Sequence, residues 1–196
     1  MLVKERFYNL VPKPILFFVL IILLNFQHAL ASEKDEIINK LKKTESLKFN
    51  FTQNTNGLIE NGKCILLFPK KLKCNYSDTK LKELIINENK MSITQKRYNK
   101  TYFYPLSKSP FLKILDKNNL IELISLSNIE IAETKIKLIS SDSLNKEIII
   151  MFEKNSFNLL GWKIKDQYNN EINFLIKINS INDQIDNNNF IIPYVN

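Results

Sequence analysis

Histidine, glycine and cysteine are scarce in this sequence. The chain of 196 residues contains one histidine, His28, three glycines and two cysteines. With a single histidine, the chain has little material for a Ser-His-Asp triad or for acid-base catalysis by imidazole. Three glycines do not make a glycine-rich phosphate loop, and two cysteines without histidine partners do not make a tetrahedral zinc site. We therefore expect no enzyme, no metal site and no cofactor.

Arginine is also scarce, although the chain is basic. The formal net charge is +8 at pH 7, and nearly all of the positive charge is lysine, because Arg6 and Arg97 are the two arginines. Base readout and planar phosphate binding favour arginine. We therefore expect no nucleic-acid partner, and we interpret the charge as a lysine-rich surface that attracts anionic membranes or acidic partners.

The N-terminal segment has the pattern of a secretory signal peptide. Three basic residues precede an apolar run at residues 15–26, and a small-residue Ala-Leu-Ala pattern ends at Ala31. The run is short of the roughly 20 residues that a membrane-spanning helix needs. We predict a cleaved signal peptide at 1–31 and a single exported domain at 32–196. Ser32 stands where a lipoprotein would need a cysteine.

In the first half of the chain, apolar and polar residues alternate in short runs, as in strands that are buried on one face. Asn56-Gly57 and Asn61-Gly62 are turn dipeptides, and Pro69-Lys70-Lys71 is expected to turn a hairpin. An amphipathic helix is predicted over 33–47, leading into the first strand. The predicted strands span residues 46–54, 63–68, 72–76, 81–86, 91–95 and 101–104.

The second half begins with apolar residues at helical spacing. Ser109 is a suitable cap and Pro110 suits a first helical position, so one or two short helices are predicted within 109–125. Strand patterns return at residues 129–139, 146–153, 159–167 and 171–181. The predicted class is α+β, with an antiparallel sheet and few helices.

The first strand, SLKFNFTQN at 46–54, has one apolar face formed by Phe49 and Phe51. The next residue on that face is Gln53, where the alternation calls for another apolar side chain. The face is either part of an ordinary core or a surface that is kept apolar so that it binds something else.

The two cysteines, Cys64 and Cys74, lie in the two arms of the predicted hairpin. They have the same parity about its turn, so we expect their side chains on one face of adjacent strands. In an oxidising compartment they form a disulfide if their Cα atoms come within about 7 Å. The alternative is a pair of small buried hydrophobic residues.

Several motifs follow one another in an order that a known family shares. After the helix come FTQ at 51–53, a glycine at 62, a strand ending at Pro69, KLKCNY at 71–76, YFYPLSKSPFLKILD at 102–116 and GWKIKDQYNNEINFLI at 161–176. In this order and spacing, and with the signal peptide, the chain resembles the periplasmic outer-membrane lipoprotein carrier family, the LolA-like proteins. The resemblance covers essentially all of 32–196.

The resemblance implies an unclosed antiparallel β-barrel, or half-barrel, with an N-terminal helix and short lid helices covering an apolar cavity. It implies a monomeric chaperone of the periplasm that holds the acyl chains of lipoproteins. An inner-membrane ABC-type lipoprotein-releasing complex would supply this cargo, and an outer-membrane lipoprotein receptor would accept it. Such a carrier needs an apolar cavity rather than a catalyst, because each buried CH₂ group contributes about 0.8 kcal/mol.

The resemblance also assigns residues to the cavity and the lid. Leu72 and Cys74 stand where the family usually has aromatic wall residues, and Phe68 stands where many members have an arginine that hydrogen-bonds to the lid. Without that arginine, lid closure is expected to depend on apolar contacts. The residues assigned to the cavity and lid are Phe49, Phe51, Leu66, Phe68, Leu72, Cys74, Phe111, Leu112, Ile114 and Leu115.

Three other functions are left open. An outer-membrane lipoprotein receptor, or a carrier of another lipid, shares the expected fold. A secreted hydrolase belongs to a different class, and the histidine-free exported chain disfavours it. A structural or adhesive envelope protein would have a sheet filled by its own side chains, with no cavity of ligand size.

Overall fold

The computed structural model describes residues 32–105, 114–141, 147–165 and 169–193. Within these residues, eleven antiparallel strands form one sheet in the order β6-β5-β4-β3-β2-β1-β11-β10-β9-β8-β7. The strands at the two edges, β6 and β7, do not pair with each other, so the sheet is unclosed. The predicted α+β half-barrel is confirmed. The predicted signal peptide lies outside the described residues.

The helices and strands alternate along the chain as follows. They are α2 (Glu33–Lys43), β1 (Ser46–Thr55), β2 (Leu58–Leu67), β3 (Lys71–Tyr76), β4 (Lys82–Asn87), β5 (Lys90–Gln95), the 3₁₀ turn η1 (Lys96–Tyr98), β6 (Lys100–Pro105), α4 (Lys117–Leu126), β7 (Asn128–Ile131), β8 (Lys135–Ser141), β9 (Glu147–Glu153), β10 (Leu159–Lys165), β11 (Glu171–Ile181) and the 3₁₀ turn η3 (Asn187–Phe190).

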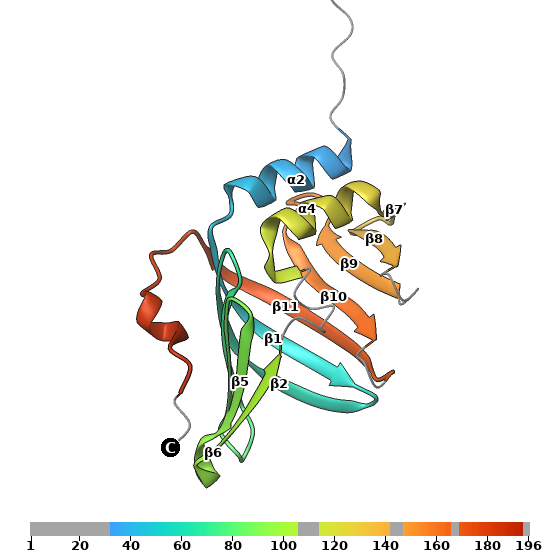
Figure 1. The fold of residues 1–196 in the computed structure, drawn as a ribbon. Coiled ribbons are helices and arrows are strands. Elements are labelled where there is room, and N and C mark those ends of the chain that lie inside the picture. Colours follow the sequence, from blue (N-terminus) through green and yellow to red (C-terminus); the bar gives the residue numbers. More distant parts are fainter. Residues whose placement is uncertain (1–31, 106–113, 142–146, 166–168, 194–196) are drawn as a thin grey trace, which may run out of the picture. The chain divides into compact units, whose positions relative to one another are not determined.

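The two helices, α2 and α4, cover one end of the sheet, and β1, β2, β5 and β6 extend beyond them (Figure 1). The first turn of α2 is acidic and its last turn is basic, an arrangement that the helix dipole favours. Asp116 caps α4 by accepting hydrogen bonds from the backbone N–H groups of Asn118 and Asn119. We call the face of the sheet under these helices the inner face.

The inner face and the two helices share one hydrophobic core. Alternate residues of β1 point into it, and α2 and α4 add their own apolar sides. The most deeply buried members come from both halves of the chain and from both helices. They include Ile37, Phe49, Ile86, Leu120, Ile124, Ile136, Leu138, Ile150 and Phe152.

The outer face of the sheet has a separate cover at one place. The C-terminal segment turns back over β3 and β4, where Phe190 of η3 is fully buried. The side-chain amide of Asn87 donates to the carbonyl oxygen of Phe190 at 3.2 Å, and Lys71 donates to the side chain of Asn187 at 2.7 Å. The turn that follows β11 is therefore held against the sheet rather than left as a free loop.

Three predicted boundaries were wrong. Asn61-Gly62 is not a turn: β2 runs through it, and the single turn between β1 and β2 is at Asn56-Gly57. The predicted strand 129–139 is two strands, β7 and β8, because the chain reverses between Ile131 and Lys135. The first helix ends at Lys43 and not at residue 47, because the following residues pair in the sheet.

Cys64 and Cys74 lie directly opposite each other on β2 and β3, on the inner face. The structure joins them in a disulfide, with 4.1 Å between their Cα atoms. Both residues are almost fully buried. The bond therefore joins two neighbouring strands, β2 and β3, within the core.

Gly62 stands within β2 because no side chain fits there. A Cβ atom at this position would lie 2.6 Å from Cε1 of Phe51 and 2.3 Å from the carbonyl oxygen of Asn75. The ring of Phe51 therefore occupies the space over this glycine. What the dipeptide pattern indicated as a turn is a packing requirement of the inner face.

We expect Gly62→Ala to destabilise the protein by about 1–3 kcal/mol, as overpacking of a core does. At this chain length the melting temperature should fall by several degrees. Asn61→Ala is the matched control: this neighbour is exposed on the outer face and loses one side-chain hydrogen bond, to Thr52. If both variants melt alike, the ring of Phe51 does not require a glycine at position 62.

Candidate functional site

Aromatic rings form a continuous row across the inner face, in or directly against its hydrophobic core. Phe51 lies at the centre: its ring centroid is 4.8 Å from that of Phe174 and 4.9 Å from that of Tyr76. Phe174 stacks in turn on Trp162, with 4.5 Å between centroids. We call these four residues, from β3, β1, β11 and β10, the aromatic row. Phe51 is the middle of an aromatic row that runs from β3 to β10, and it is itself buried in the core. A role of this face in binding stays a prediction.

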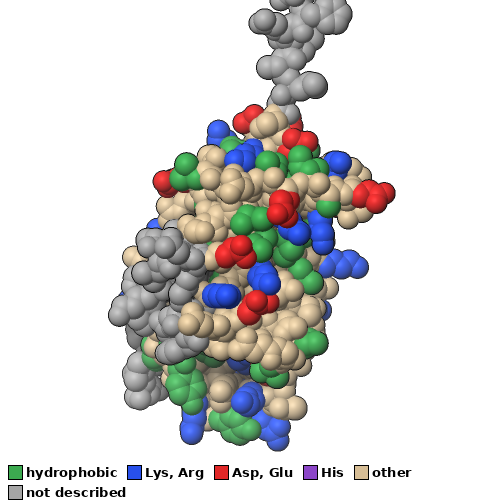
Figure 2. Space-filling view, turned by 90° about the vertical axis from the view of Figure 1, so that its right-hand side faces the viewer, with side chains coloured by type: hydrophobic (Ala, Val, Ile, Leu, Met, Phe, Trp, Pro, Cys, Tyr) green, Lys and Arg blue, Asp and Glu red, His purple; other side chains and the backbone are tan. Residues whose placement is uncertain are grey.

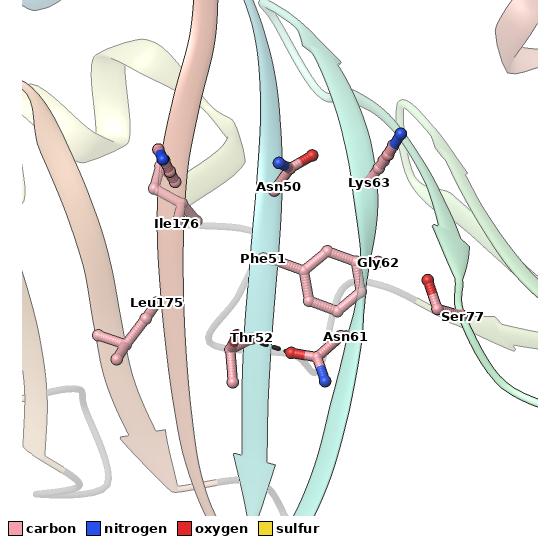
Figure 3. Close-up of a pocket in the computed structure, with 10 residues that line it drawn as sticks. Asn50, Phe51, Thr52, Asn61, Gly62, Lys63, Ser77, Leu175 and Ile176 are labelled. Carbon is pink, nitrogen blue, oxygen red and sulfur yellow. Dashed lines mark hydrogen bonds between the residues drawn. The ribbon is translucent and has the colours of Figure 1, made fainter.

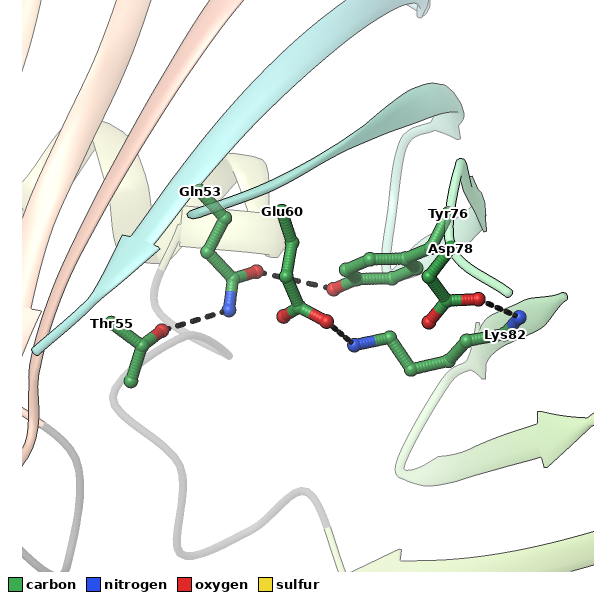
Figure 4. A network of polar contacts seen from close by, with 6 residues as sticks. All are labelled: Gln53, Thr55, Glu60, Tyr76, Asp78 and Lys82. Carbon is green, nitrogen blue, oxygen red and sulfur yellow. Dashed lines mark hydrogen bonds and ion pairs between the residues drawn. The ribbon is translucent and has the colours of Figure 1, made fainter. Parts of the chain in front are cut away.

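A polar network borders the aromatic row (Figure 4). The hydroxyl of Tyr76 donates to Oε1 of Gln53 at 3.1 Å, and Nε2 of Gln53 donates to Thr55 at 3.0 Å. Lys82 forms an ion pair with Glu60, and its Nζ lies 3.7 Å from the centroid of the Tyr76 ring. Gln53 interrupts the apolar alternation of β1 because the apolar surface ends there.

Tyr76 is neutral, as tyrosine is at neutral pH, and its surroundings disfavour ionisation further. Burial raises the pKa of its phenol well above the ordinary value, and the negative charges of Glu60 and Asp78 raise it further. The neutral hydroxyl keeps its proton and donates a hydrogen bond to Gln53. Tyr76 therefore belongs to both parts of the site, with its ring in the aromatic row and its hydroxyl in the polar network.

The structure brings most of the assigned cavity residues into the one core. Each is at most 5% exposed, except Phe68, which is half-buried against the same core. Phe111 and Leu112 lie outside the described residues. The residues that are buried together are Phe49, Phe51, Leu66, Leu72, Cys74, Ile114 and Leu115. In this structure they pack against one another and against the helices.

Among the described residues, two larger hollows lie elsewhere. One, of about 430 Å³, opens on the outer face around the backbone of Gly62, where the hydroxyl of Thr52 donates to Asn61 at 2.7 Å (Figure 3). The other, of about 1030 Å³, lies between β5, β6 and the segment after η3. Of the assigned residues, Phe51 alone lines either of them.

Polar contacts hold the start of α4 to the turn between β2 and β3. The backbone N–H of Lys70 donates to the carbonyl oxygen of Leu115 at 3.0 Å, and Nζ of Lys70 lies 2.9 Å from the carboxylate of Asp116. Nζ of Lys117 lies 5.3 Å from the ring centroid of Phe68. These contacts, which we call the α4 latch, add to the apolar contacts that the sequence led us to expect.

Asp116 is ionised in the latch. Burial raises the pKa of its carboxyl, but hydrogen bonds from Lys70 and from the N–H groups of Asn119 and Asn118, with the charge of Lys70, outweigh burial and lower the pKa below its ordinary value. Since the folded pKa is the lower one, this contribution to stability is present above the ordinary carboxyl pKa of about 3.9. It is lost as the pH falls through the folded value.

The described residues hold no group of three or more histidine, cysteine, aspartate or glutamate side chains placed to bind a metal ion. Nor does any helix among them have the length and apolar character to cross a membrane.

A family model for the outer membrane lipoprotein carrier protein LolA matches residues 42–193. The chain belongs to the LolA family. The match includes every strand of the half-barrel, the aromatic row and the α4 latch. Comparison with curated proteins finds no match.

Several solved structures are similar to this LolA-family chain at a distance. An uncharacterized conserved protein from Thermus thermophilus is 10% identical, with a TM-score of 0.45 over 75% of this chain and 86% of that one. A LolA superfamily protein from Nitrosomonas europaea is 6% identical, with a TM-score of 0.43 over 82% of this chain and 98% of that one. The match to the MucA/MucB complex of Pseudomonas aeruginosa is 10% identical, has a TM-score of 0.47 and covers 83% of this chain and 62% of that one.

Of the aromatic row, only Phe51 had been assigned to the site from the sequence, and none of the polar network had been. Trp162 and Phe174 were detectable, because each stands on the apolar side of an alternating strand. Glu60 and Lys82 were not, since a charged residue in a strand gives no sign of its partner. The latch partners Lys70 and Asp116 are far apart in the sequence and meet only in the fold.

Leu72→Glu tests whether the inner face is sealed. Leu72 is 3% exposed in the core, so a carboxylate there loses water without gaining a partner, which costs several kcal/mol. We expect the melting temperature to fall by roughly 10 °C or more. Leu72→Met, which conserves volume, should cost less than about 1.5 kcal/mol. Near-native melting of Leu72→Glu would mean that water reaches this position in the folded protein.

Lys70→Met tests the α4 latch. Removing the ammonium leaves the backbone contact in place but breaks the ion pair with Asp116, so α4 should open more often. We expect hydrogen exchange of the α4 amides to rise about five-fold, the equivalent of about 1 kcal/mol. Lys163→Met is the control, because it breaks an exposed ion pair with Glu171, between β10 and β11, at a similar distance of 2.9 Å. Equal exchange in the two variants would contradict a latch.

Proposed function

We propose that this chain is a periplasmic lipoprotein carrier, which binds the acyl chains of lipoproteins released from the inner membrane and delivers them to the outer membrane. The observation that carries the proposal is an apolar inner face, with its aromatic row, in an unclosed sheet of a LolA-family chain. The family is described as one of lipoprotein carriers, and a carrier has no chemical step to catalyse.

The physical task of such a carrier is to replace water around acyl chains. Each CH₂ group moved from water to an apolar surface contributes about 0.8 kcal/mol. The inner face offers that surface from β3 to β10, and its aromatic rings present flat apolar area without rotatable chains. The polar network of Gln53, Glu60 and Lys82 then marks where acyl chains end and hydrated parts of the cargo begin.

Loading requires the inner face to be uncovered, because its residues are buried against the helices. We assign this movement to α4, which contacts the sheet through Leu120, Leu123 and Ile124. Few polar contacts hold it: the latch at its start, and Nζ of Lys34, which donates to the carbonyl oxygens of Ser125 and Ser127 near its end. Acyl chains that replace α4 on the sheet would offset the loss of its apolar contacts.

The proposed partners follow from this task. An inner-membrane ABC-type complex supplies the lipoprotein, and an outer-membrane receptor accepts it. The carrier works as a monomer in the periplasm, to which the predicted signal peptide directs it.

Co-purification tests the cargo. The protein is isolated from the periplasm, and bound molecules are identified by mass spectrometry. Triacylated or diacylated peptides are the expected result. Free lipids alone would indicate a carrier of another lipid. Neither lipids nor acylated peptides, in a protein that folds normally, would favour a structural envelope protein.

A disulfide across the latch tests the movement of α4. The backbones meet at 3.0 Å between the N–H of Lys70 and the carbonyl oxygen of Leu115, and the Lys70 and Asp116 side chains form an ion pair, so we place the two cysteines at positions 70 and 116. We expect the oxidised double variant Lys70→Cys/Asp116→Cys to release no lipoprotein from inner-membrane vesicles, and gentle reduction to restore release. The two single variants control for the loss of the ion pair. Normal release by the locked protein would show that α4 does not gate the site.

A further inference from the structure

Two turns lie side by side at the end of the sheet far from the helices (Figure 1). One is the turn before β4, with Lys80 and Leu81. The other is formed by η1 and the start of β6. The backbone N–H of Arg97 donates to the carbonyl of Lys80 at 3.2 Å, and that of Lys96 donates to Leu81 at 3.4 Å. We call Lys80, Leu81, Lys96, Arg97, Tyr98 and Lys100 the basic tip.

The apolar residues of the basic tip are exposed without a structural reason. Leu81 is 58% exposed and Tyr98 is 53% exposed. Leu81 also has φ of +51°, a left-handed conformation that is unfavourable for leucine and suits asparagine or glycine. Stability of the turn alone would therefore not select leucine here. A strained backbone that presents an apolar side chain to water points to a binding role.

The charges of the basic tip itself are all positive. Every charged residue of the basic tip is a lysine or arginine, and the acidic residues nearby already have partners. The carboxylate of Asp78 accepts from the backbone of Lys82, Glu83 pairs with Lys73 and Lys96, and Glu60 pairs with Lys82. Basic and hydrophobic side chains lie together at the lower end of Figure 2. Lys80, Arg97 and Lys100 are exposed, and the guanidinium of Arg97 also donates to the carbonyl oxygen of Thr79 at 3.4 Å.

We propose that the basic tip docks on the surface of an anionic phospholipid bilayer, with Leu81 and Tyr98 entering the headgroup region and the cations contacting lipid phosphates. Tyrosine is enriched at this depth of membranes, and each cation near an anionic surface contributes about a five-fold gain in binding. The two apolar residues sit on adjacent projecting turns, which suits a fluid surface better than a groove of fixed shape. Apolar and electrostatic attraction together make such binding stable yet reversible.

Vesicle flotation tests the basic tip without any lipoprotein present, so its outcome is independent of the proposed cargo. The exported protein is mixed with phosphatidylcholine vesicles, with or without phosphatidylglycerol. We expect binding to the vesicles that contain phosphatidylglycerol, with a loss of about ten-fold or more in high salt. Arg97→Gln/Lys100→Gln should bind at least ten-fold more weakly. No binding to anionic vesicles would overturn the proposal.

Leu81→Asn separates docking from folding. Asparagine tolerates the positive φ, so the variant should melt at or above the temperature of the unaltered protein while binding anionic vesicles several-fold more weakly. Leu58→Asn is the matched control: Leu58 is 65% exposed at the β1–β2 turn, outside the basic tip. Full vesicle binding by Leu81→Asn, with loss only in the charge variants, would show that the cations alone hold the protein to the bilayer, and it would overturn the entry of Leu81 into the headgroup region.

Discussion

The rest of this structure depends on the apolar inner face of a sheet that does not close. A closed barrel of this size would bury its lining within itself, but here β6 and β7 remain apart and the lining needs a cover. Two helices supply it at one end of the sheet. At the centre, the ring of Phe51 fills the space over Gly62, stacks on Phe174 and meets Tyr76 edge to face. The disulfide between Cys64 and Cys74 fixes adjacent strands beneath the same surface.

Polar interactions mark the limits of this face rather than its interior. At one limit, the hydroxyl of Tyr76 and the side chain of Gln53 end the apolar surface in a satisfied hydrogen bond. At another, Lys70 and Asp116 join the strand turn to α4. Contacts of this kind are partly exposed and are worth little each. They therefore position the cover while leaving most of the binding free energy to apolar burial, which is the balance that a reversible carrier requires.

The closed arrangement and the proposed function are compatible because the cover and the cargo are chemically alike. Leu120, Leu123 and Ile124 of α4 present aliphatic groups to the sheet, as an acyl chain would. Exchange of one for the other conserves most of the buried apolar area, so the energetic difference between empty and loaded states is small compared with the total burial. The proposal is therefore compatible with the close packing of the residues assigned to a cavity.

The sequence by itself determined the class of fold, the order of most strands and the family, because alternation has a period of two on any half-buried strand and the motifs keep their spacing. It also placed Cys64 and Cys74 on one face. The turn predicted at Asn61-Gly62 was wrong, because the sequence does not distinguish a glycine required by packing from a glycine required by a turn. The partners of Lys70, Lys82 and Tyr76 were decided only by the tertiary structure, since sequence periodicity describes which face a side chain occupies and not which distant residue meets it there.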